Sequence, residues 1–286
     1  MKLITWNTQW CCGLDGSVSP QRIVDQARAM ADFDVLCLQE IAQGFDGLDG
    51  GPGDQPAQLQ ALLPGFRLFF GAAVDEFDSQ GRRQRFGNLI ATRLPVARVH
   101  HQALPWPADP AVSSMPRMCS SLTLISSSLG LPLRVMTTHL EYHSGTQRLA
   151  QARALRGWHA EAVDQALAPP QAEAAGTPFQ AKLHAPEALL CGDFNMPASD
   201  AAYAELLAPF GSVDGAQRRL HDAWQVAHGA TPQPPTFRLY DQRFGTDPVA
   251  CDFVFLSDGL APRLRRIEVD TATRASDHQP VLVELA

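Results

Sequence analysis

The sequence of 286 residues contains no uncharged apolar run of about 18 residues, which is the length that a helix needs to cross a bilayer. We therefore expect no membrane-spanning helix and no stable association with a membrane. The first residues read directly as a strand, and the apolar segment typical of a secretory leader is lacking. Together these absences predict a cytoplasmic location.

Cysteine pairs with the CxxC spacing are also missing. The chain has six cysteines, and only Cys11 and Cys12 are near one another in sequence. Zinc sites built from thiolates use short, regular ligand spacings, so this pattern argues against one. Several of the cysteines lie inside apolar runs. We expect buried free thiols, as is usual for proteins of a reducing compartment.

Positive charge is in short supply. Lysine and arginine together number 23 against 30 acidic residues, which gives a net charge of −7. A protein that coats duplex DNA normally has a basic surface, because it must neutralise phosphates. The composition therefore argues against such a protein. It constrains an enzyme less, because bound cations can supply positive charge locally.

Two segments combine carboxylates with other polar groups at the ends of apolar runs. Gly192-Asp193-Phe194-Asn195 follows a run that reads as a buried strand, and Ser276-Asp277-His278 precedes another. Asp with Asn suits a hard cation and an attacking water, whereas Asp with His suits a metal ligand beside a proton acceptor. The pattern indicates a metal-dependent hydrolase.

Four further strand-like runs carry one such residue each at an end. They contribute Asn7, Glu40, His139 and Asp252. The sequence resembles the endonuclease/exonuclease/phosphatase family, the deoxyribonuclease I-like superfamily, because the signature segments of that family occur here in the same order. The segments that carry this resemblance are Trp6-Asn7, Gln39-Glu40, Gly87-Asn88, Thr138-His139, Gly192-Asp193-Phe194-Asn195, Asp252 and Ser276-Asp277-His278.

The arrangement of expected elements is mixed α/β. Many strand-like runs with few intervening helices suggest two packed sheets with helices outside them. The resemblance implies an α+β fold: a four-layer α/β/β/α sandwich of two mostly antiparallel sheets packed face to face. Because the candidate residues run from position 7 to position 278, we expect one catalytic domain over 1–286, acting as a monomer.

Helices are expected at 20–31, 58–63, 144–168 and 201–207. Strands are expected at 35–39, 66–70, 86–92, 96–101, 118–125, 131–140, 188–191, 252–256, 264–269 and 281–285. Segments 44–57, 74–85, 105–117 and 228–248 are expected to be loops that decide the substrate. The segment 169–186, rich in Pro and Ala, is expected to be a mobile excursion.

The predicted metal site uses oxygen ligands and takes Mg²⁺ or Mn²⁺. Glu40 ends a run so apolar that its buried carboxylate needs a partner, and a cation provides one. Asn7 can ligate the metal through its carbonyl or orient a carboxylate through its amide. The resemblance adds Asp277 as a further metal residue.

The predicted catalytic residues are Asp193, Asn195, His278, Asp252 and His139. Asp193 holds or deprotonates the attacking water, and Asn195 positions it. The resemblance implies that Asp252 hydrogen-bonds His278, which then acts as a general base or binds a phosphoryl oxygen as imidazolium. His139 donates a proton or hydrogen bond to the phosphate.

Three residues are expected on the substrate side. Asn88 resembles a substrate-contacting Asn of the family, and Arg85 and Arg117 offer guanidinium groups that suit phosphate oxygens. The leading expectation is a nuclease that hydrolyses phosphodiester bonds in DNA or RNA. The alternatives are a phosphatase or phospholipase C-type enzyme acting on inositol phosphate, sphingomyelin or a nucleotide, and a catalytically silent binding domain.

Overall fold

Two six-stranded sheets form the centre of the computed structural model, which describes residues 1–213 and 216–286. Residues 214 and 215 of the expected domain 1–286 lie outside the described residues. The first sheet comprises β1 (Lys2–Asn7), β2 (Val35–Gln43), β3 (Arg67–Phe77), β4 (Arg83–Thr92), β13 (Leu264–Val269) and β14 (Val281–Leu285). The second comprises β5 (Val96–Ala103), β6 (Met118–Ser126), β7 (Leu131–His139), β8 (Ala188–Asp193), β11 (Leu220–Asp222) and β12 (Asp252–Ser257).

Strand order is β13-β14-β1-β2-β4-β3 in the first sheet and β11-β12-β8-β7-β6-β5 in the second. Each sheet has one parallel pair, β1 with β2 and β7 with β8, and its other neighbours are antiparallel. The expectation of two mostly antiparallel sheets is therefore confirmed. Strands β9 (Phe210–Val213) and β10 (Ala216–Arg218) form a separate small hairpin.

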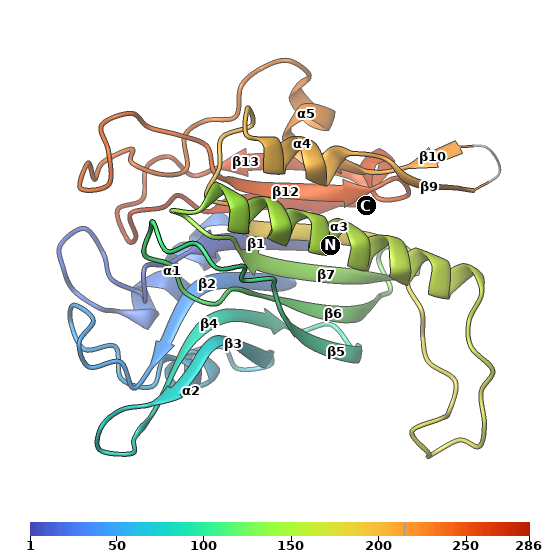
Figure 1. Cartoon of the computed structure of the whole chain (residues 1–286), viewed down its shortest axis with the longest axis horizontal. Helices are drawn as coiled ribbons and strands as arrows, with labels where there is room; N and C mark the ends of the chain where they lie inside the picture. The colour runs from blue at the N-terminus through green and yellow to red at the C-terminus, as the bar shows by residue number, and fades with distance from the viewer. Residues whose placement is uncertain (214–215) are drawn as a thin grey trace.

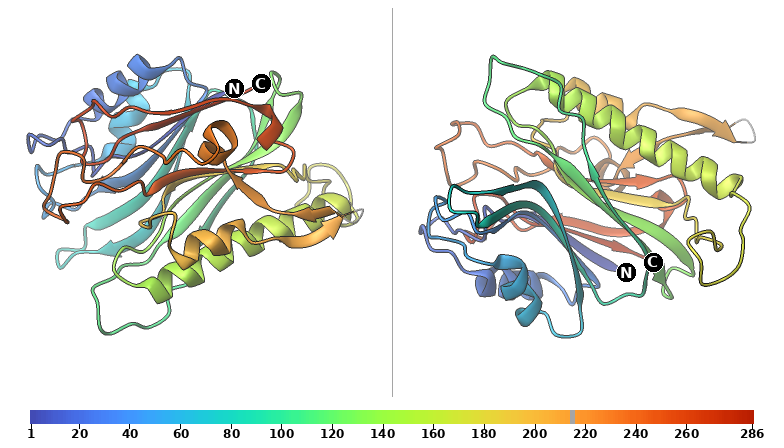
Figure 2. Two further views of the ribbon diagram at one scale, coloured as in Figure 1. Left: turned by 90° about the horizontal axis from the view of Figure 1, so that it is seen from above. Right: turned by 60° about the horizontal axis from the view of Figure 1, so that its bottom comes forward.

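Helices cover the outer faces of both sheets. Helices α1 (Pro20–Met30) and α2 (Gln55–Leu62) lie outside the first sheet, and α3 (Gly145–Leu167) and α4 (Ala201–Leu207) lie outside the second (Figure 1, Figure 2). The short α5 (Ala223–His228) contacts β12 and β13 at one edge, and a 3-10 helix spans Ala261–Arg263. The predicted four-layer α/β/β/α sandwich is confirmed.

Alternate residues of the central strands supply two different cores. In β2, Val35 and Cys37 pack between the sheets, whereas Leu36 and Leu38 pack under α1 and α2. A third apolar cluster lies between the second sheet and the helices α3 and α4. Successive side chains of a strand point to opposite faces, so strands buried on both faces read as continuous apolar runs. This explains why the runs were recognisable in the sequence.

The two sheets face each other with corresponding strands aligned. The facing pairs are β1 with β8, β2 with β7, β4 with β6 and β14 with β12. The ends of β1, β7 and β8 that carry Asn7, His139 and Asp193 consequently meet at one edge of the sandwich, together with Glu40, which lies at an irregularity within β2. Polar groups bridge the sheets just below this edge, where Gln39 Nε2 donates to Thr137 Oγ1 at 2.8 Å.

Several helices begin directly after a residue whose side chain caps the helix N-terminus. Ser19 caps α1 by accepting from Arg22 N, with Pro20 as the first helical residue, and Ser144 caps α3 by accepting from Gln147 N. Helix α4 has the expected bounds, Ala201–Leu207. Asp54 caps α2, which therefore begins at Gln55, three residues before the predicted start at 58.

The segment 74–85 differs from its expectation. It is largely a hairpin of β3 and β4 instead of a loop, and Arg83 pairs with Asp75 across it at 2.6 Å. Residues 169–186 contain no helix or strand and extend away from the body of the molecule (Figure 1). Their mobility stays a prediction. Among the described residues, no helix combines the length and apolar character that a bilayer crossing requires.

Gly192 allows β8 to approach β7 just before the candidate site. Its φ is +138°, and a Cβ built on it would lie 1.9 Å from Thr138 O. Because backbone cannot yield as a flexible side chain can, we expect Gly192→Ala to lower the free energy of unfolding by about 3 kcal/mol or more. Urea unfolding measures this loss.

Gly65→Ala is the matched control for Gly192→Ala. Gly65 also has a positive φ, +83°, but a Cβ there would meet no atom within 4 Å. Its substitution should cost only the backbone strain, about 1 kcal/mol. Equal losses in the two variants would contradict the steric argument.

Candidate active site

A cavity of about 200 Å³ opens where the strand ends of the two sheets meet. Residues from both sheets and from the connecting loops line it. They are Gln9, Trp10, Glu40, Met115, Arg117, His139, Tyr142, His143, Asp193, Asn195, Phe237, Phe244, Asp277 and His278. The list includes seven of the residues proposed from the sequence, so the fold brings together side chains that are up to 238 positions apart (Glu40 to His278).

Contacts in the site pair equivalent strands of the two sheets. Asn7 with Asp193 joins β1 to β8, Glu40 with His139 joins β2 to β7, and Asp252 with His278 joins β12 to the residues before β14. The closest polar atoms are Asn7 Nδ2 and Asp193 Oδ2 (2.9 Å), Glu40 Oε1 and His139 Nδ1 (3.9 Å), and Asp252 Oδ2 and His278 Nδ1 (2.8 Å).

Two carboxylates, Glu40 and Asp277, lie on the first-sheet side of the cavity. The pKa of the Glu40 carboxyl is raised to about 7, mainly because of burial and next because of the negative charge of Asp277. Burial likewise raises the pKa of Asp277. Asn7 Nδ2 donates to Glu40 Oε1 at 3.1 Å as well as to Asp193, while its carbonyl accepts from Gln9 N. Asn7 thus presents its amide to the carboxylates, which is the second of the two arrangements considered for it.

Asp193 ends β8, and a turn after it brings Asn195 back to the same side. Asn195 has φ +50°, and its backbone N donates to Asp193 Oδ1 at 2.8 Å. The turn, not strand alternation, therefore places both side chains at the cavity. Burial alone would raise the pKa of Asp193, but the neighbouring His278 and His139 rings lower it below its ordinary value. Asp193 is thereby held as a carboxylate.

His278 is fixed by contacts on several sides. Its Nδ1 bonds Asp252, Trp6 Nε1 donates to its carbonyl at 2.9 Å, and the ring of Phe237 stacks on it with centroids 4.3 Å apart. Its Nε2 lies 3.7 Å from Asp193 Oδ2. Burial would lower the pKa of His278, but the carboxylates of Asp252 and Asp193 raise it well above its ordinary value.

His139 lies opposite, with its Nε2 2.9 Å from Asn195 Nδ2 and 3.4 Å from Asp193 Oδ2. Burial and the charge of Arg117 lower the pKa of His139 to about 3. Arg117 lines the cavity and donates from Nε to Glu141 at 3.2 Å. Its buried Nη1 has no hydrogen-bond partner among the residues that the structure describes.

Asn88 and Arg85 do not line the cavity. Asn88 is buried between the sheets, where its Nδ2 donates to Met118 O at 3.3 Å. Arg85 bonds Gln43 and lies over the ring of Phe70, 5.4 Å from its centroid. The direct contacts with substrate that we expected of these two residues are not supported by their positions. Their local bonds instead join β4 to its neighbours.

The backbone around the cavity is strained. Among the described residues, six other than glycine have a positive φ, and four of them line the cavity: Gln9, Trp10, Glu40 and Asn195. Such conformations cost about 1–3 kcal/mol each and persist where the surroundings enforce them. Gln55 does so here, because it accepts from Ala42 N at 2.9 Å and donates to Trp10 O.

A second group of potential metal ligands lies deeper. Asp193, Cys251, Asp252 and His278 are all buried and offer ligand atoms within 4.8 Å of one another. Asp252 Oδ2 in this group already accepts from His278 and from Cys251 Sγ. Burial raises the pKa of the Cys251 thiol well above its ordinary value, which opposes thiolate ligation. The six cysteines are all free and buried, as expected.

Several cavity residues were not proposed from the sequence. Trp10, Tyr142, Phe237 and Phe244 reach the cavity from loops, and the buried Glu141 lies behind it as the partner of Arg117. Two of these loops meet where Tyr142 Oη donates to Phe244 O at 3.3 Å. No spacing signal in the sequence indicates such contacts between distant loops.

The hydrogen bond between Asp252 and His278 predicts strongly non-additive losses. If Asp252 acts by orienting His278, Asp252→Ala should cost little further activity once His278 is replaced by Ala. Measuring kcat for both single variants and the double variant tests this. Independent, multiplicative losses would mean that Asp252 has a separate, structural role.

Several solved structures are similar to this chain in fold, and the name of one of them states a phosphatase. A mannosyl-6-phosphatase of Bacteroides thetaiotaomicron matches with 19% identity and a TM-score of 0.67, covering 100% of this chain and 99% of that one. A truncated TDP2 of Caenorhabditis elegans matches with 16% identity, TM-score 0.59 and coverage of 99% and 95%. The human Nocturnin catalytic domain with bound sulfate has 15% identity, TM-score 0.61 and coverage of 100% and 94%.

At these identities the likeness shows a shared fold. A search of curated proteins gave no match to the chain. The sequence model of one family does match, over residues 4–278, and that range takes in every candidate site residue named above. The chain therefore belongs to the Endonuclease/Exonuclease/phosphatase family.

Proposed function

We propose that this protein is a divalent-metal-dependent phosphoester hydrolase with its active site in the cavity at the strand ends. The observation that carries the proposal is the convergence of three features on one cavity. These are a carboxylate pair (Glu40 and Asp277), an Asp-Asn pair at the end of β8 and the Asp252–His278 dyad. Each supplies a different requirement of phosphoryl transfer.

The residues present fit Mg²⁺ or Mn²⁺. Glu40, whose side chain is 19% exposed, and the buried Asp277 are carboxylates whose charges oppose one another, and desolvation raises both pKa values. A hard cation with oxygen ligands relieves that opposition, whereas the deeper group containing Cys251 offers a thiol that suits softer metals. When bound, the cation neutralises charge that develops on the phosphoryl oxygens and on the leaving group.

The other residues hold and orient the reacting groups. Asp193, kept ionised by its neighbours, accepts a hydrogen bond or a proton from the attacking water. Asn195 fixes the position of Asp193 through its backbone and faces His139 with its amide. His139 and His278 lie on either side of Asp193 Oδ2 at 3.4 and 3.7 Å, where each can bind a phosphoryl oxygen.

For the substrate, phosphodiesters of DNA or RNA stay the leading expectation. A second candidate, a small phosphate monoester, is favoured by the pairing of several exposed arginines. Arg82, Arg83 and Arg243 all pair with aspartates, so they leave little free positive charge for a long nucleic acid. The name of the mannosyl-6-phosphatase among the similar structures supports this second candidate.

Hydrolysis of model substrates tests the function. Purified protein is assayed on bis-p-nitrophenyl phosphate, p-nitrophenyl phosphate, single-stranded DNA, RNA and hexose phosphates, with Mg²⁺, with Mn²⁺ and with chelator. We expect chelator-sensitive turnover, and the preferred substrate separates the two candidates. If no substrate is turned over under any condition, the reading as a catalytically silent binding domain holds instead.

A further inference from the structure

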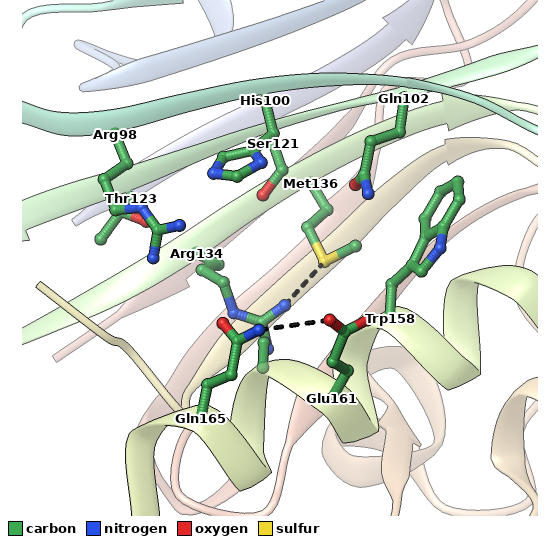
Figure 3. Close-up of a pocket in the computed structure, with 11 residues that line it drawn as sticks. Arg98, His100, Gln102, Ser121, Thr123, Arg134, Met136, Trp158, Glu161 and Gln165 are labelled. Atoms are coloured by element: carbon green, nitrogen blue, oxygen red, sulfur yellow. Dashed lines mark hydrogen bonds between the residues drawn. The ribbon is translucent and has the colours of Figure 1, made fainter. Parts of the chain in front are cut away.

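A second polar pocket, of about 140 Å³, lies on the outer face of the second sheet beneath α3. Figure 3 shows side chains of β5, β6 and β7 and of α3 converging on it. Arg134 of β7 lies on its floor, five residues before His139, which is about 16 Å along an extended strand. Arg134 faces α3, whereas Val135 beside it packs between the sheets, so this pocket is separate from the active site.

Arg134 is a buried cation without a carboxylate partner. It is only 8% exposed, and its donors bond the carbonyls of Ala185 and Pro186, the ring nitrogen of His159 and the sulfur of Met136. All of these are neutral acceptors, and no ion pair to Arg134 exists within the described part of the chain. Burial lowers the pKa of Arg134 to about 10. A buried charge of this kind is costly until an anion compensates it.

Other donors around Arg134 have no side-chain partner, in contrast to Arg134 itself. Arg98 forms no hydrogen bond or ion pair with any described residue, and the buried hydroxyls of Ser121 and Thr123 form no side-chain hydrogen bond there either. The one carboxylate lining the pocket, Glu161 of α3, accepts a hydrogen bond from Gln165 Nε2 at 3.2 Å (Figure 3). The pocket therefore combines two guanidinium groups and two hydroxyls against a single acid.

We propose that this pocket binds a small oxyanion of the phosphate class, held by Arg98 and Arg134 with the Ser121 and Thr123 hydroxyls. Guanidinium forks bind tetrahedral oxyanions through paired, charge-assisted hydrogen bonds, and hydroxyls donate to the remaining oxygens. A volume of about 140 Å³ admits a phosphate group with a small substituent, but not a nucleic-acid strand.

The indole of Trp158, which lines this pocket, provides a local signal for the test. Indole N–H resonances are followed by NMR in the metal-free protein during titration with inorganic phosphate, methyl phosphate and acetate. Trp10 lines the active-site cavity and reports binding there in the same spectra. Trp158→Phe and Trp10→Phe assign the two signals. We expect saturable shifts of the Trp158 signal with a phosphate compound and not with acetate.

Arg98 is the residue to replace, because Arg134 also braces two backbone carbonyls. Arg98→Gln should weaken phosphate binding at Trp158 about tenfold, the effect of losing one charge-assisted contact. Glu161→Gln should strengthen phosphate binding about threefold, since it removes a negative charge that repels the anion. Preference for methyl phosphate over inorganic phosphate identifies an organic phosphate as the ligand type, and the reverse identifies free phosphate.

The proposal is overturned if the Trp158 signal stays unmoved up to about 50 mM of either phosphate compound. It is also overturned if the Trp158 signal shifts but Arg98→Gln and Glu161→Gln both bind phosphate with the affinity of the unmodified protein. Neither outcome depends on hydrolysis at the active site. Loss of the Trp10 shift alone would instead bear on the proposed function.

Discussion

Asp193→Asn is expected to lower kcat by about 10²–10⁴-fold, the usual effect of losing a positioned general base. Asn has the same shape and can still accept from Asn195 N through Oδ1, so the turn after β8 should persist. What it loses is the negative charge between His139 and His278 and the ability to take a proton from water. Steady-state hydrolysis of the preferred model phosphoester measures the effect.

Asp222→Asn provides the control for Asp193→Asn. Asp222 is also a buried carboxylate, 5% exposed, but it caps α5 and accepts from Tyr203 Oη at 2.6 Å, outside the active-site cavity. It should affect stability and leave kcat near the wild-type value. Turnover of Asp193→Asn at the wild-type rate would remove Asp193 from the mechanism.

Glu40→Gln is expected to weaken Mn²⁺ binding by more than about 100-fold, because even residues that only support a metal ligand contribute 10–100-fold. Activity should fall by orders of magnitude with it. Gln can still accept the hydrogen bond from Asn7 Nδ2, and loss of the charge removes the repulsion with Asp277. The metal-free unfolding temperature should therefore not fall.

Isothermal titration with Mn²⁺ and thermal unfolding test Glu40→Gln. Glu187→Gln serves as the control, because Glu187 is a partly buried carboxylate that bonds Ser257 Oγ and Gly259 N away from the cavity. It should retain wild-type affinity for Mn²⁺. The same affinity in Glu40→Gln as in Glu187→Gln would rule out Glu40 as the principal ligand.

Much of this fold could be predicted because the central strands are buried on both faces. Their apolar runs stand out, and polar residues such as Asn7, Glu40 and Asp193 mark where the runs end. A cap signal was informative at Ser19, which precedes the predicted helix start at 20. The outer half of the β3–β4 hairpin was missed because it is polar and exposed, so no period of two is visible there.

That most candidate residues lie together was predictable from the sequence, whereas their arrangement was less so. Family motifs identify Asp252 and His278, but the stacking of Phe237 on His278 results from the path of a distant loop. Arg85 was expected to bind phosphate on account of its charge, yet its guanidinium faces Gln43 and Phe70. Residue type predicts what a side chain can bind, while packing determines what it does contact.

Because the site residues come from both sheets, a ligand bound there also helps to hold the two sheets together. A ligand held by Glu40 of one sheet and by Asp193 or His139 of the other contacts both halves only in the folded state, since unfolding separates these strands. Binding of this kind adds stability by mass action, about 2.7 kcal/mol at a ligand concentration 100 times Kd. Supply of metal and phosphoester would then govern not only turnover but also how long the folded protein survives proteolysis.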